Sequence, residues 1–353
     1  MPAPVLIRPV CERDAPQLQA LADLLDTVNL PDDPQALAAL ISGSQRSFAS
    51  LEPGARSLSD PLHASFTLVA VASGEGKAGS DERLLGTASL FAYHGMPEEP
   101  HYYLRVVEGT LHSRQLGAER TRTVLKLGRD TEPWTELGGL VVHPLARGAG
   151  VGKLLVAARL LLVAMHPERF CRRLLAELLP PRVGSGGNGG NAFWDSVGAP
   201  LTGLDYYRAD LLCRTDKEFI EAFFPHEEIV VDLLPPAARA LIGVEGPDTT
   251  PVRKLLQRAG LRYLGTVDPF DAGPHDGAEV AQVPPIQRSR RLVRLDLPPL
   301  HETASWLVAN PVSGVQLCLP VELCGGGVRL AHDHAQRLGA APGAVLWAMP
   351  LDW

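Results

Sequence analysis

The chain of 353 residues is long enough for two domains, or for one large domain with an appendage. Hydrophobic residues make up 45% and charged residues 21%, which is ordinary for a globular protein and excludes a disordered or collagen-like one. The net charge of −7 and the lack of a basic run argue against a nucleic-acid-binding protein, because phosphate backbones attract clusters of Lys and Arg.

The cysteines and the N-terminus favour a cytoplasmic protein. The five cysteines contain no CxxC pair and are odd in number, so we expect free thiols. The first residues lack the basic start and apolar core of a signal peptide. The longest apolar stretch, residues 154–165, is interrupted by Arg159 and is too short to span a bilayer, so we expect no membrane association.

The first third of the chain alternates strand and helix patterns. Residues 5–10 are predicted to form a strand, followed by two helices at residues 13–25 and 34–48. The spacing then predicts two strands, 65–72 and 84–93, that form a hairpin around the polar loop SGEGKAGSDER. Residues 102–116 have extended character.

The middle of the chain contains the clearest unit. A strand is predicted over residues 134–142, followed by Pro144, a glycine-rich turn at 147–152 and a helix that ends near residue 165. Another strand is predicted at 173–179. The order strand, glycine turn, helix, strand is that of a βαβ-type unit.

The remainder is predicted to contain shorter elements. The segment PPRVGSGGNGGNAF has the composition of a flexible loop. Gly260 is expected to end the last of several helices. The predicted helices are 193–197, 216–224, 235–242 and 250–259, and the predicted strands are 261–267, 287–295 and 344–351.

The glycine turn predicts an anion-binding site. The first turn of a helix has main-chain N–H groups without partners, and the helix dipole favours negative charge there. Glycines allow close approach of a phosphate, and Arg147 and Lys153 add positive charge. A dinucleotide motif would need glycine at position 153, and a Walker A loop would need glycine at 147 and Ser or Thr at 154, so both are excluded.

The turn resembles that of the GCN5-related N-acetyltransferase superfamily, which has Arg or Gln, then glycines, between a strand and a helix. Arg147, Gly150 and Gly152 meet this pattern, and ELGGLVVHP fits the preceding strand. The resemblance implies that the turn, with Gly148, holds the CoA pyrophosphate, and that the splayed strand, including Val142, binds the pantetheine arm.

A closer resemblance covers most of the chain, up to about residue 293. The motifs that carry it are TELGGLVVHPLARGAGVGKLL, HPERF, FWDSVG, DKEFIEAFFP, LIG with PxTxP, and DPFDAGP. Their order is similar to that of the arginine N-succinyltransferase family, which transfers succinyl from succinyl-CoA to the α-amine of arginine or, in some members, ornithine. The resemblance puts the family's acyl-CoA-contacting leucine at Leu140. It puts Gly246 where the family has its proton-donor histidine, and glycine has no proton to donate.

Four residues are therefore candidates for acid–base catalysis, and two for binding the acceptor. Each also has an ordinary alternative as a loop or strand-end residue. Glu136 lies in the splayed strand, where the superfamily often has a base, and the two aspartates of DPFDAGP would suit a cationic substrate, although the second also suits a turn. The acid–base candidates are Glu136, His226, Glu245 and His275, and the acceptor-binding candidates are Asp268 and Asp271.

Metal chemistry is not indicated by the spacing of ligand-type residues. Cys318, Cys324, His332 and His334 lie within a short span, but their spacing fits no strong zinc pattern. We expect no metal and no permanently bound cofactor, only succinyl-CoA or another acyl-CoA as co-substrate.

The sequence thus predicts an α+β protein with a GCN5-related N-acetyltransferase-like mixed sheet flanked by helices and a C-terminal α+β extension. Residues 1–215 are expected to form the acyl-CoA-binding domain, and residues 216–353 to complete the acceptor site. The predicted function is arginine N-succinyltransferase. Transfer to another amine acceptor, or a non-catalytic acyl-CoA-binding subunit of a hetero-oligomer, stays open as an alternative. The partners expected are the amino-acid acceptor and acyl-CoA, with a homo- or hetero-oligomer left open.

Overall fold

The computed structural model describes residues 5–25, 30–52, 54, 58, 60–72, 82–181, 191–213, 217–300 and 305–353. The strands are β1 (Val5–Pro9), β2 (Ser65–Ala72), β3 (Arg83–His94), β4 (His101–Ser113), β5 (Ala118–Asp130), β6 (Trp134–Val142), β7 (Arg173–Glu177), β8 (Ile229–Val230), β9 (Arg262–Val267), β10 (Pro274–Glu279), β11 (Arg290–Arg294), β12 (Ser305–Ala309), β13 (Gln316–Pro320), β14 (Glu322–Cys324), β15 (Gly327–Arg329) and β16 (Val345–Pro350). The α-helices are α1 (Ala15–Leu25), α2 (Pro34–Ala49), α3 (Val151–Met165), α4 (Ala192–Ser196), α5 (Gly198–Thr202), α6 (Tyr206–Cys213), α7 (Glu218–Phe223), α8 (Pro236–Arg239), α9 (Thr250–Ala259), α10 (Pro284–Gln287) and α11 (His332–Arg337).

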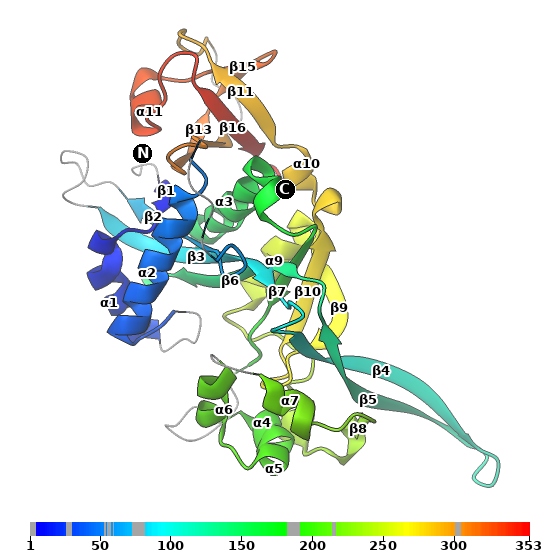
Figure 1. Ribbon diagram of the computed structural model, residues 1–353. Helices are drawn as coiled ribbons and strands as arrows, with labels where there is room; N and C mark the ends of the chain where they lie inside the picture. Colours follow the sequence, from blue (N-terminus) through cyan, green and yellow to red (C-terminus); the bar gives the residue numbers. More distant parts are fainter. Residues whose placement is uncertain are drawn as a thin grey trace.

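One mixed sheet runs through the whole molecule (Figure 1). Its strand order is β14-β15-β11-β16-β12-β13-β1-β2-β3-β6-β7-β10-β9-β4-β5-β8. Among the described strands, the β6–β7 and β11–β15 pairs are parallel, and the other pairs are antiparallel. The predicted fold class, α+β with a mixed sheet flanked by helices, is confirmed.

The predicted elements of the central part are confirmed. β2 and β3 form the predicted hairpin, whose loop, residues 73–81, lies outside the described residues, as does the glycine-rich segment 182–190. β6, α3 and β7 form the predicted βαβ unit, with β6 parallel to β7. Helix α9 has the predicted bounds and ends at Gly260, whose φ is +115°. The sequence did not reveal β5, which pairs with β4 along thirteen residues on each strand.

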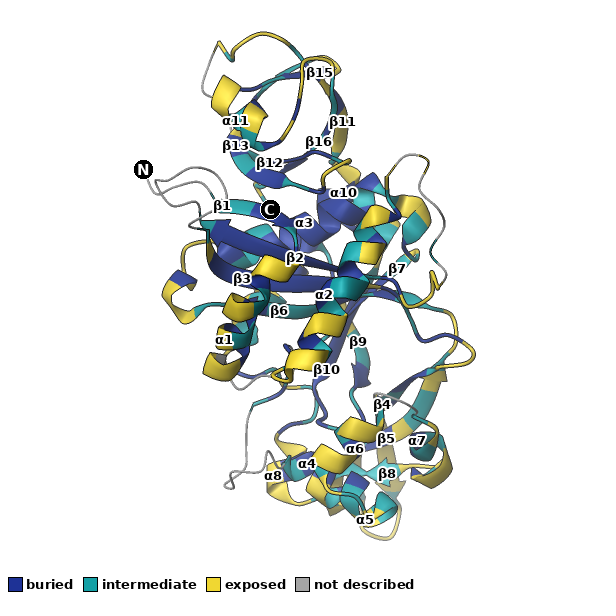
Figure 2. Ribbon diagram, turned by 60° about the vertical axis from the view of Figure 1, so that its left-hand side comes forward, coloured by how far each residue is buried: buried dark blue, intermediate teal, exposed yellow. Residues whose placement is uncertain are grey.

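Helices cover both faces of the central strands, and this explains the continuous apolar run of β2. Val69 and Val71 pack with α1 and α2, whereas Leu68 and Ala70 pack with α3 on the opposite face. Successive side chains of a strand point to opposite faces, so a strand covered on both sides is apolar at nearly every position. Figure 2 shows these strands and α3 as the most buried part of the molecule.

Two further hydrophobic cores lie at the ends of the sheet. One is formed by the β4–β5 hairpin and the short helices α4 to α8, around Phe193 and Trp194. The other is formed by β11 to β16 and α11, and Figure 1 shows it at the opposite end of the molecule. The division at residue 215 stays a prediction. None of the five cysteines forms a disulfide, and no described helix has the length and hydropathy needed to cross a bilayer.

A buried ion cluster connects β1 to the first helical turn. The Arg8 guanidinium donates to both carboxylate oxygens of Asp14, at 2.8 and 2.7 Å, and to Glu82. Arg8 and Asp14 are 7% and 3% exposed, respectively. Loss of either partner therefore leaves a desolvated charge without its counter-ion.

We expect Asp14→Asn to lower the free energy of unfolding by about 1–3 kcal/mol at neutral pH, because Arg8 loses a buried anionic partner. Burial by itself would raise the pKa of Asp14, but hydrogen bonds from Arg8 and from the main-chain amide of Cys11 lower it overall. The carboxylate's contribution is complete above the pKa of an unfolded Asp, about 3.9. It is lost as pH falls through the lower pKa of the folded protein.

The difference between wild type and Asp14→Asn should therefore shrink in acid. Urea unfolding at neutral pH and below the pKa of free Asp measures it, with the exposed Asp232→Asn as control for the same change of charge. Equal differences at both pH values would contradict the prediction.

Candidate active site

Strands β6 and β7 pair only at their beginnings and then separate. Thr135 pairs with Leu174 and Glu136 with Leu175, and no later pair is formed although β6 continues to Val142. The other edge of β6 is paired with β3, and that ladder shifts by one residue at Gly139, whose φ is +57°. This bulge bends β6 and leaves main-chain groups of residues 137–142 without a strand partner on the β7 side.

A buried arginine of α3 stabilises the bulge of β6. Arg159, in the middle of α3, is 1% exposed and donates from Nη1 to the main-chain oxygens of Gly138, at 3.1 Å, and Ser89, at 3.4 Å. Burial lowers its pKa to about 10, against the opposing effect of the Glu136 carboxylate. The guanidinium therefore links α3 to Ser89 of β3 and Gly138 of β6, the pair beside which the register of the β3–β6 ladder changes.

The glycine turn has an anion-binding geometry. Gly148 and Gly150 have φ of +78° and +81°, and Gly150 is the N-cap of α3. A Cβ at either position would meet no atom within 4 Å, so their role is conformational and the space around them is open. Arg147 is exposed beside the turn, 3.4 Å from a carboxylate oxygen of the exposed Asp248.

The other residues predicted to contact acyl-CoA lie on β6. Leu140 and Val142 are partly buried and pack against the core beneath the splay. Lys153, in contrast, does not face the turn: its ammonium donates to the main-chain oxygens of Leu351 and Trp353, at 2.6 and 2.8 Å. The ammonium of Lys153 is thus paired with the last residues of the chain, whereas the guanidinium of Arg147 is exposed beside the turn.

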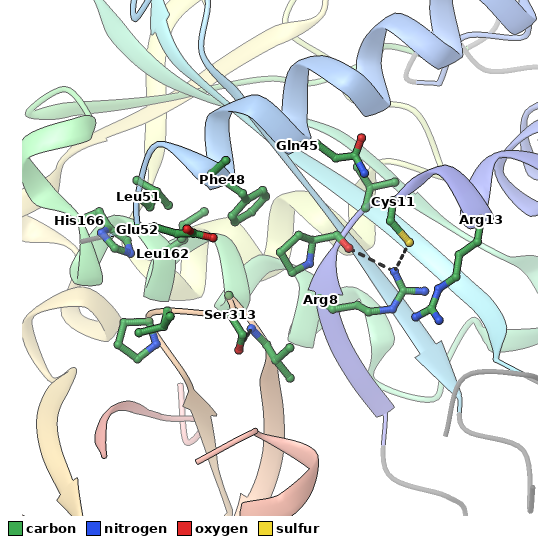
Figure 3. Close-up of a pocket in the computed structure, with 17 residues that line it drawn as sticks. Arg8, Cys11, Arg13, Gln45, Phe48, Leu51, Glu52, Leu162, His166 and Ser313 are labelled. Carbon is green, nitrogen blue, oxygen red and sulfur yellow. Dashed lines mark hydrogen bonds between the residues drawn. The ribbon is translucent and has the colours of Figure 1, made fainter. Parts of the chain in front are cut away.

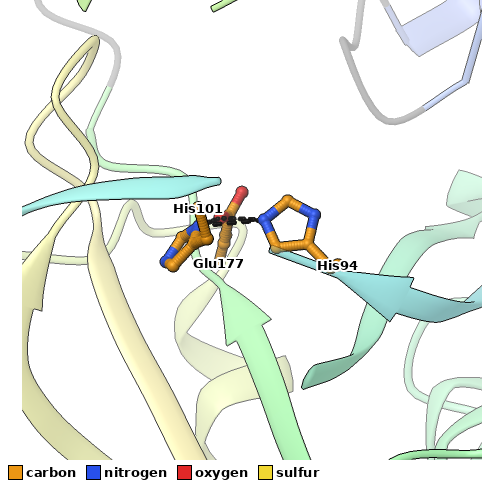
Figure 4. A group of neighbouring side chains, drawn as sticks. All are labelled: His94, His101 and Glu177. Atoms are coloured by element: carbon orange, nitrogen blue, oxygen red, sulfur yellow. Dashed lines mark hydrogen bonds and ion pairs between the residues drawn. The ribbon is translucent and has the colours of Figure 1, made fainter. Parts of the chain in front are cut away.

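Titratable side chains gather where β6 and β7 separate. His94 Nε2 lies 2.9 Å from His101 Nδ1 and 3.6 Å from Glu177 Oε1, and His101 Nδ1 lies 3.3 Å from the same oxygen. Figure 4 shows both imidazoles turned toward the Glu177 carboxylate. Glu136 Oε2 lies 3.3 Å from the other nitrogen of His94. His275, on β10 opposite Glu177, is fully buried, with its ring centroid 5.1 Å from that of His101.

Burial shifts the pKa values in this cluster. It raises the pKa of Glu136 to about 8, and the nearby Glu177 carboxylate adds to this effect. It lowers the pKa of His94 to about 3, although Glu177 opposes the shift. The site therefore combines a carboxyl group that titrates near neutrality with imidazoles held neutral, an arrangement common in catalytic sites.

An acidic turn borders the cluster. Asp268 Oδ1 accepts hydrogen bonds from the amides of Phe270, at 2.7 Å, and Asp271, at 3.1 Å, and Asp271 Oδ1 accepts from the amide of Gly273, at 2.7 Å. Burial raises the pKa of Asp268 to about 7 and that of Asp271 well above its usual range, with further contributions from neighbouring carboxylates. Carboxylate oxygens of Asp268 and Glu177 and a ring nitrogen of His275 lie within 4.8 Å of one another.

The comparisons with known proteins point to one family. The family described as arginine N-succinyltransferase beta subunit matches residues 5–284. The chain belongs to the arginine N-succinyltransferase family.

Individual members of this family align along nearly the whole chain. The "Arginine N-succinyltransferase" of Yersinia pseudotuberculosis serotype O:3 is 30% identical, over 96% of this chain and 95% of its own. The "Arginine N-succinyltransferase subunit beta" of Pseudomonas aeruginosa is 29% identical, over 99% and 98%. The solved structure of arginine/ornithine succinyltransferase subunit AI from Pseudomonas aeruginosa superposes with a TM-score of 0.79 at 26% identity, covering 99% of this chain and all of that one.

The structure brings together some of the residues that the family resemblance singled out. Glu136, His275 and Asp268 lie at the cluster, and Asp271 lies in the turn beside it. His226 is exposed and does not belong to the cluster. The sequence analysis missed His94, His101 and Glu177. Glu177 ends β7, which is parallel to the strand that contains Glu136, and its place in the predicted βαβ unit could have identified it. The two histidines lie on other strands, and no spacing in the sequence marks them.

The segment around Gly246 has no room for the family's histidine. A Cβ at Gly246 would lie 2.7 Å from the main-chain oxygen of Pro180, closer than real Cβ contacts. The neighbouring Glu245 accepts a hydrogen bond from Arg253 at 2.6 Å, and its pKa is lowered because this pairing and a main-chain hydrogen bond outweigh burial. A side chain at 246 would thus require movement of the chain after β7.

A surface pocket of about 400 Å³ lies elsewhere in the molecule. Figure 3 shows it between α2, β1 and the segment around Ser313, with Arg8 and His166 in its lining. His166 caps the C-terminal end of α3, about 20 Å along the helix from the glycine turn at its N-terminal end. The pocket is therefore separate from the splay of β6 and β7.

Proposed function

We propose that this protein transfers a succinyl group from succinyl-CoA to the α-amine of L-arginine, giving CoA and N2-succinyl-L-arginine. The observation that carries the proposal is the splay of β6 from β7, which has the anion-binding turn at one end and Glu136 at the other. An acyl-CoA bound in the slot between the separated strands β6 and β7 would have its phosphates at Gly148–Gly152 and its thioester carbonyl beside the bulge of β6.

The reaction is a direct attack on the thioester. The amine nitrogen bonds to the carbonyl carbon, the C–S bond breaks, and CoA leaves as a thiolate that is protonated from solvent. Glu136 takes the proton that the nitrogen loses. Its Oε2 faces His94, and its Oε1 would lie 2.9 Å from a Cβ at Gly138, so a side chain at that position would crowd the carboxylate.

The acceptor end of the site is suited to a cationic amino acid. The carboxyl groups of Asp268 and Asp271 lie in one turn, that of Asp271 is buried, and a guanidinium pairs with carboxylates through two parallel hydrogen bonds. Binding a cation there would offset the repulsion between these carboxyl groups. Glu136 comes from the first part of the chain and the aspartates from the second, so both parts would form the site.

The mechanism assigns no proton donor to position 246. General acid–base catalysis contributes about 10²–10⁴-fold to a rate, and positioning with carbonyl polarisation contributes separately. A transferase that protonates its leaving thiolate from solvent therefore retains much of its acceleration.

The same proposal places the protein in the cytoplasm, where free thiols persist, and needs no permanently bound cofactor. Two relatives are named as subunits, which supports an oligomer, formed with copies of this chain or with a second chain. Light scattering on the purified chain measures its oligomeric state.

Release of free thiol from succinyl-CoA tests the function, with arginine, ornithine and no acceptor in parallel. We expect arginine-dependent release that Arg147→Glu strongly reduces by raising the KM for succinyl-CoA. Arg114→Glu, an exposed change of the same charge in the β4–β5 turn, should leave turnover unchanged. Release with another amine alone would mean a different acceptor, and CoA binding without release for any amine would favour a non-catalytic subunit.

A further inference from the structure

Three ligand atoms from different strands converge at the acceptor end of the site. The distances among His94 Nε2, His101 Nδ1 and Glu177 Oε1 are 2.9, 3.3 and 3.6 Å. His94 ends β3, His101 begins β4 and Glu177 ends β7, so the three side chains are held by one sheet. Figure 4 shows them around a common point.

The triangle has the dimensions of a tetrahedral metal site. Zinc binds imidazole nitrogen and carboxylate oxygen at about 2.0–2.1 Å, which separates neighbouring ligand atoms by about 3.3 Å in a tetrahedron. A hydrogen-bonded chain would instead have each N–H directed at one acceptor. Here every pair of the three atoms is close, and a single cation between them would satisfy all three.

The surroundings match the outer shell of such a site. The nitrogen of His94 that faces away from the triangle lies 3.3 Å from Glu136 Oε2, as in a carboxylate–histidine–metal arrangement. Next to the His101 ring, the buried Nε2 of His275 has no hydrogen-bond partner among the described residues. The His275 ring adjoins that of His101, and it belongs with Glu177 and Asp268 to a second group of ligand atoms.

We propose that His94, His101 and Glu177 bind a divalent transition-metal ion of the zinc class, with the fourth coordination position on the side of His275. Two imidazoles with one carboxylate suit this class, whereas Mg²⁺ and Ca²⁺ prefer oxygen ligands throughout. The sequence analysis expected no metal, because Cys318, Cys324, His332 and His334, the residues it considered, fit no strong zinc pattern. An ion at this position would lie next to Glu136, and its open position could take the amine or carboxylate of an amino acid.

Cobalt titration of the full-length protein tests the site. After chelation and dialysis, we expect one equivalent of Co²⁺ to bind, with the strong visible absorption of a tetrahedral ion, and Zn²⁺ to displace it. His94→Asn and His101→Asn should each abolish this absorption, with folding checked by circular dichroism. The matched control is His112→Asn, an exposed histidine of the β4–β5 hairpin that should leave binding unchanged.

A second variant tests whether Glu136 supports the metal ligand His94. Glu136→Gln weakens the support of His94, and we expect about 10–100-fold lower metal affinity rather than complete loss. Absence of saturable binding by the wild type, or binding that survives both histidine variants, would overturn the proposal. No acyl-CoA or amine is present in the titration, so its result is independent of whether the protein turns over succinyl-CoA.

Discussion

Glu136→Gln is expected to lower kcat for arginine-dependent thiol release by about 10²–10⁴-fold. Gln has the shape of Glu and still hydrogen-bonds, but it cannot take a proton from the attacking amine. Because Glu136 lies at the end of the slot away from the glycine turn, the affinity for succinyl-CoA should change little.

Steady-state kinetics and direct CoA binding measure the two parts of this prediction. The control is Glu108→Gln, an exposed carboxylate of the β4–β5 hairpin, which should retain wild-type kcat. A Glu136→Gln protein with near-wild-type kcat would rule out Glu136 as the base.

Trp194→Ala is expected to lower the free energy of unfolding by about 3–5 kcal/mol. Trp194 is fully buried and stacks on Phe270, with ring centroids 4.6 Å apart and planes 3° from parallel. Its indole N–H also donates to the main-chain oxygen of Leu204 at 3.0 Å. The substitution removes the stacking, leaves a cavity and breaks this hydrogen bond.

The same variant should affect the acceptor more than the acyl donor. Phe270 lies between Asp268 and Asp271, so loss of its stacking partner loosens the acidic turn. We expect a higher KM for arginine and a nearly unchanged KM for succinyl-CoA in the protein that remains folded. Denaturant unfolding measures the stability. The control is Leu211→Ala in α6, where Leu211 is 52% exposed, and this change should lower the free energy of unfolding by less than about 0.5 kcal/mol. Equal effects of the two variants on stability would contradict the prediction.

The acyl-CoA end of the candidate site could be predicted because its parts are adjacent in the chain. β6, the turn at Gly148–Gly152 and α3 follow one another, and each has a local signal: alternation, glycines, then helical periodicity. The splay itself was implied by the family resemblance. That Lys153 faces Leu351 and Trp353 could not be predicted, because its partners come from the other end of the chain.

The acceptor end could be predicted only in part. Glu136 and the DPFDAGP turn were found through resemblance, but His94 and His101 flank an ordinary loop, and nothing local distinguishes them from exposed histidines. Their meeting with Glu177 depends on the sheet order β3-β6-β7-β10-β9-β4, in which β4 lies far from β3 although it follows β3 in the chain.

The sequence by itself determined the α+β class, the βαβ unit with its anion-binding turn and the family of this protein, because short-range periodicity and motif order suffice for these. The tertiary structure alone decided which titratable groups share one buried space. Interactions between charges and imidazoles extend over a few ångströms in space, whatever their separation along the chain. The pairing of β10 with β7 puts His275 opposite Glu177, and the pairings of β9 with β10 and β4 join the strand of His101 to the same sheet, so that His101 reaches Glu177 and the cluster forms.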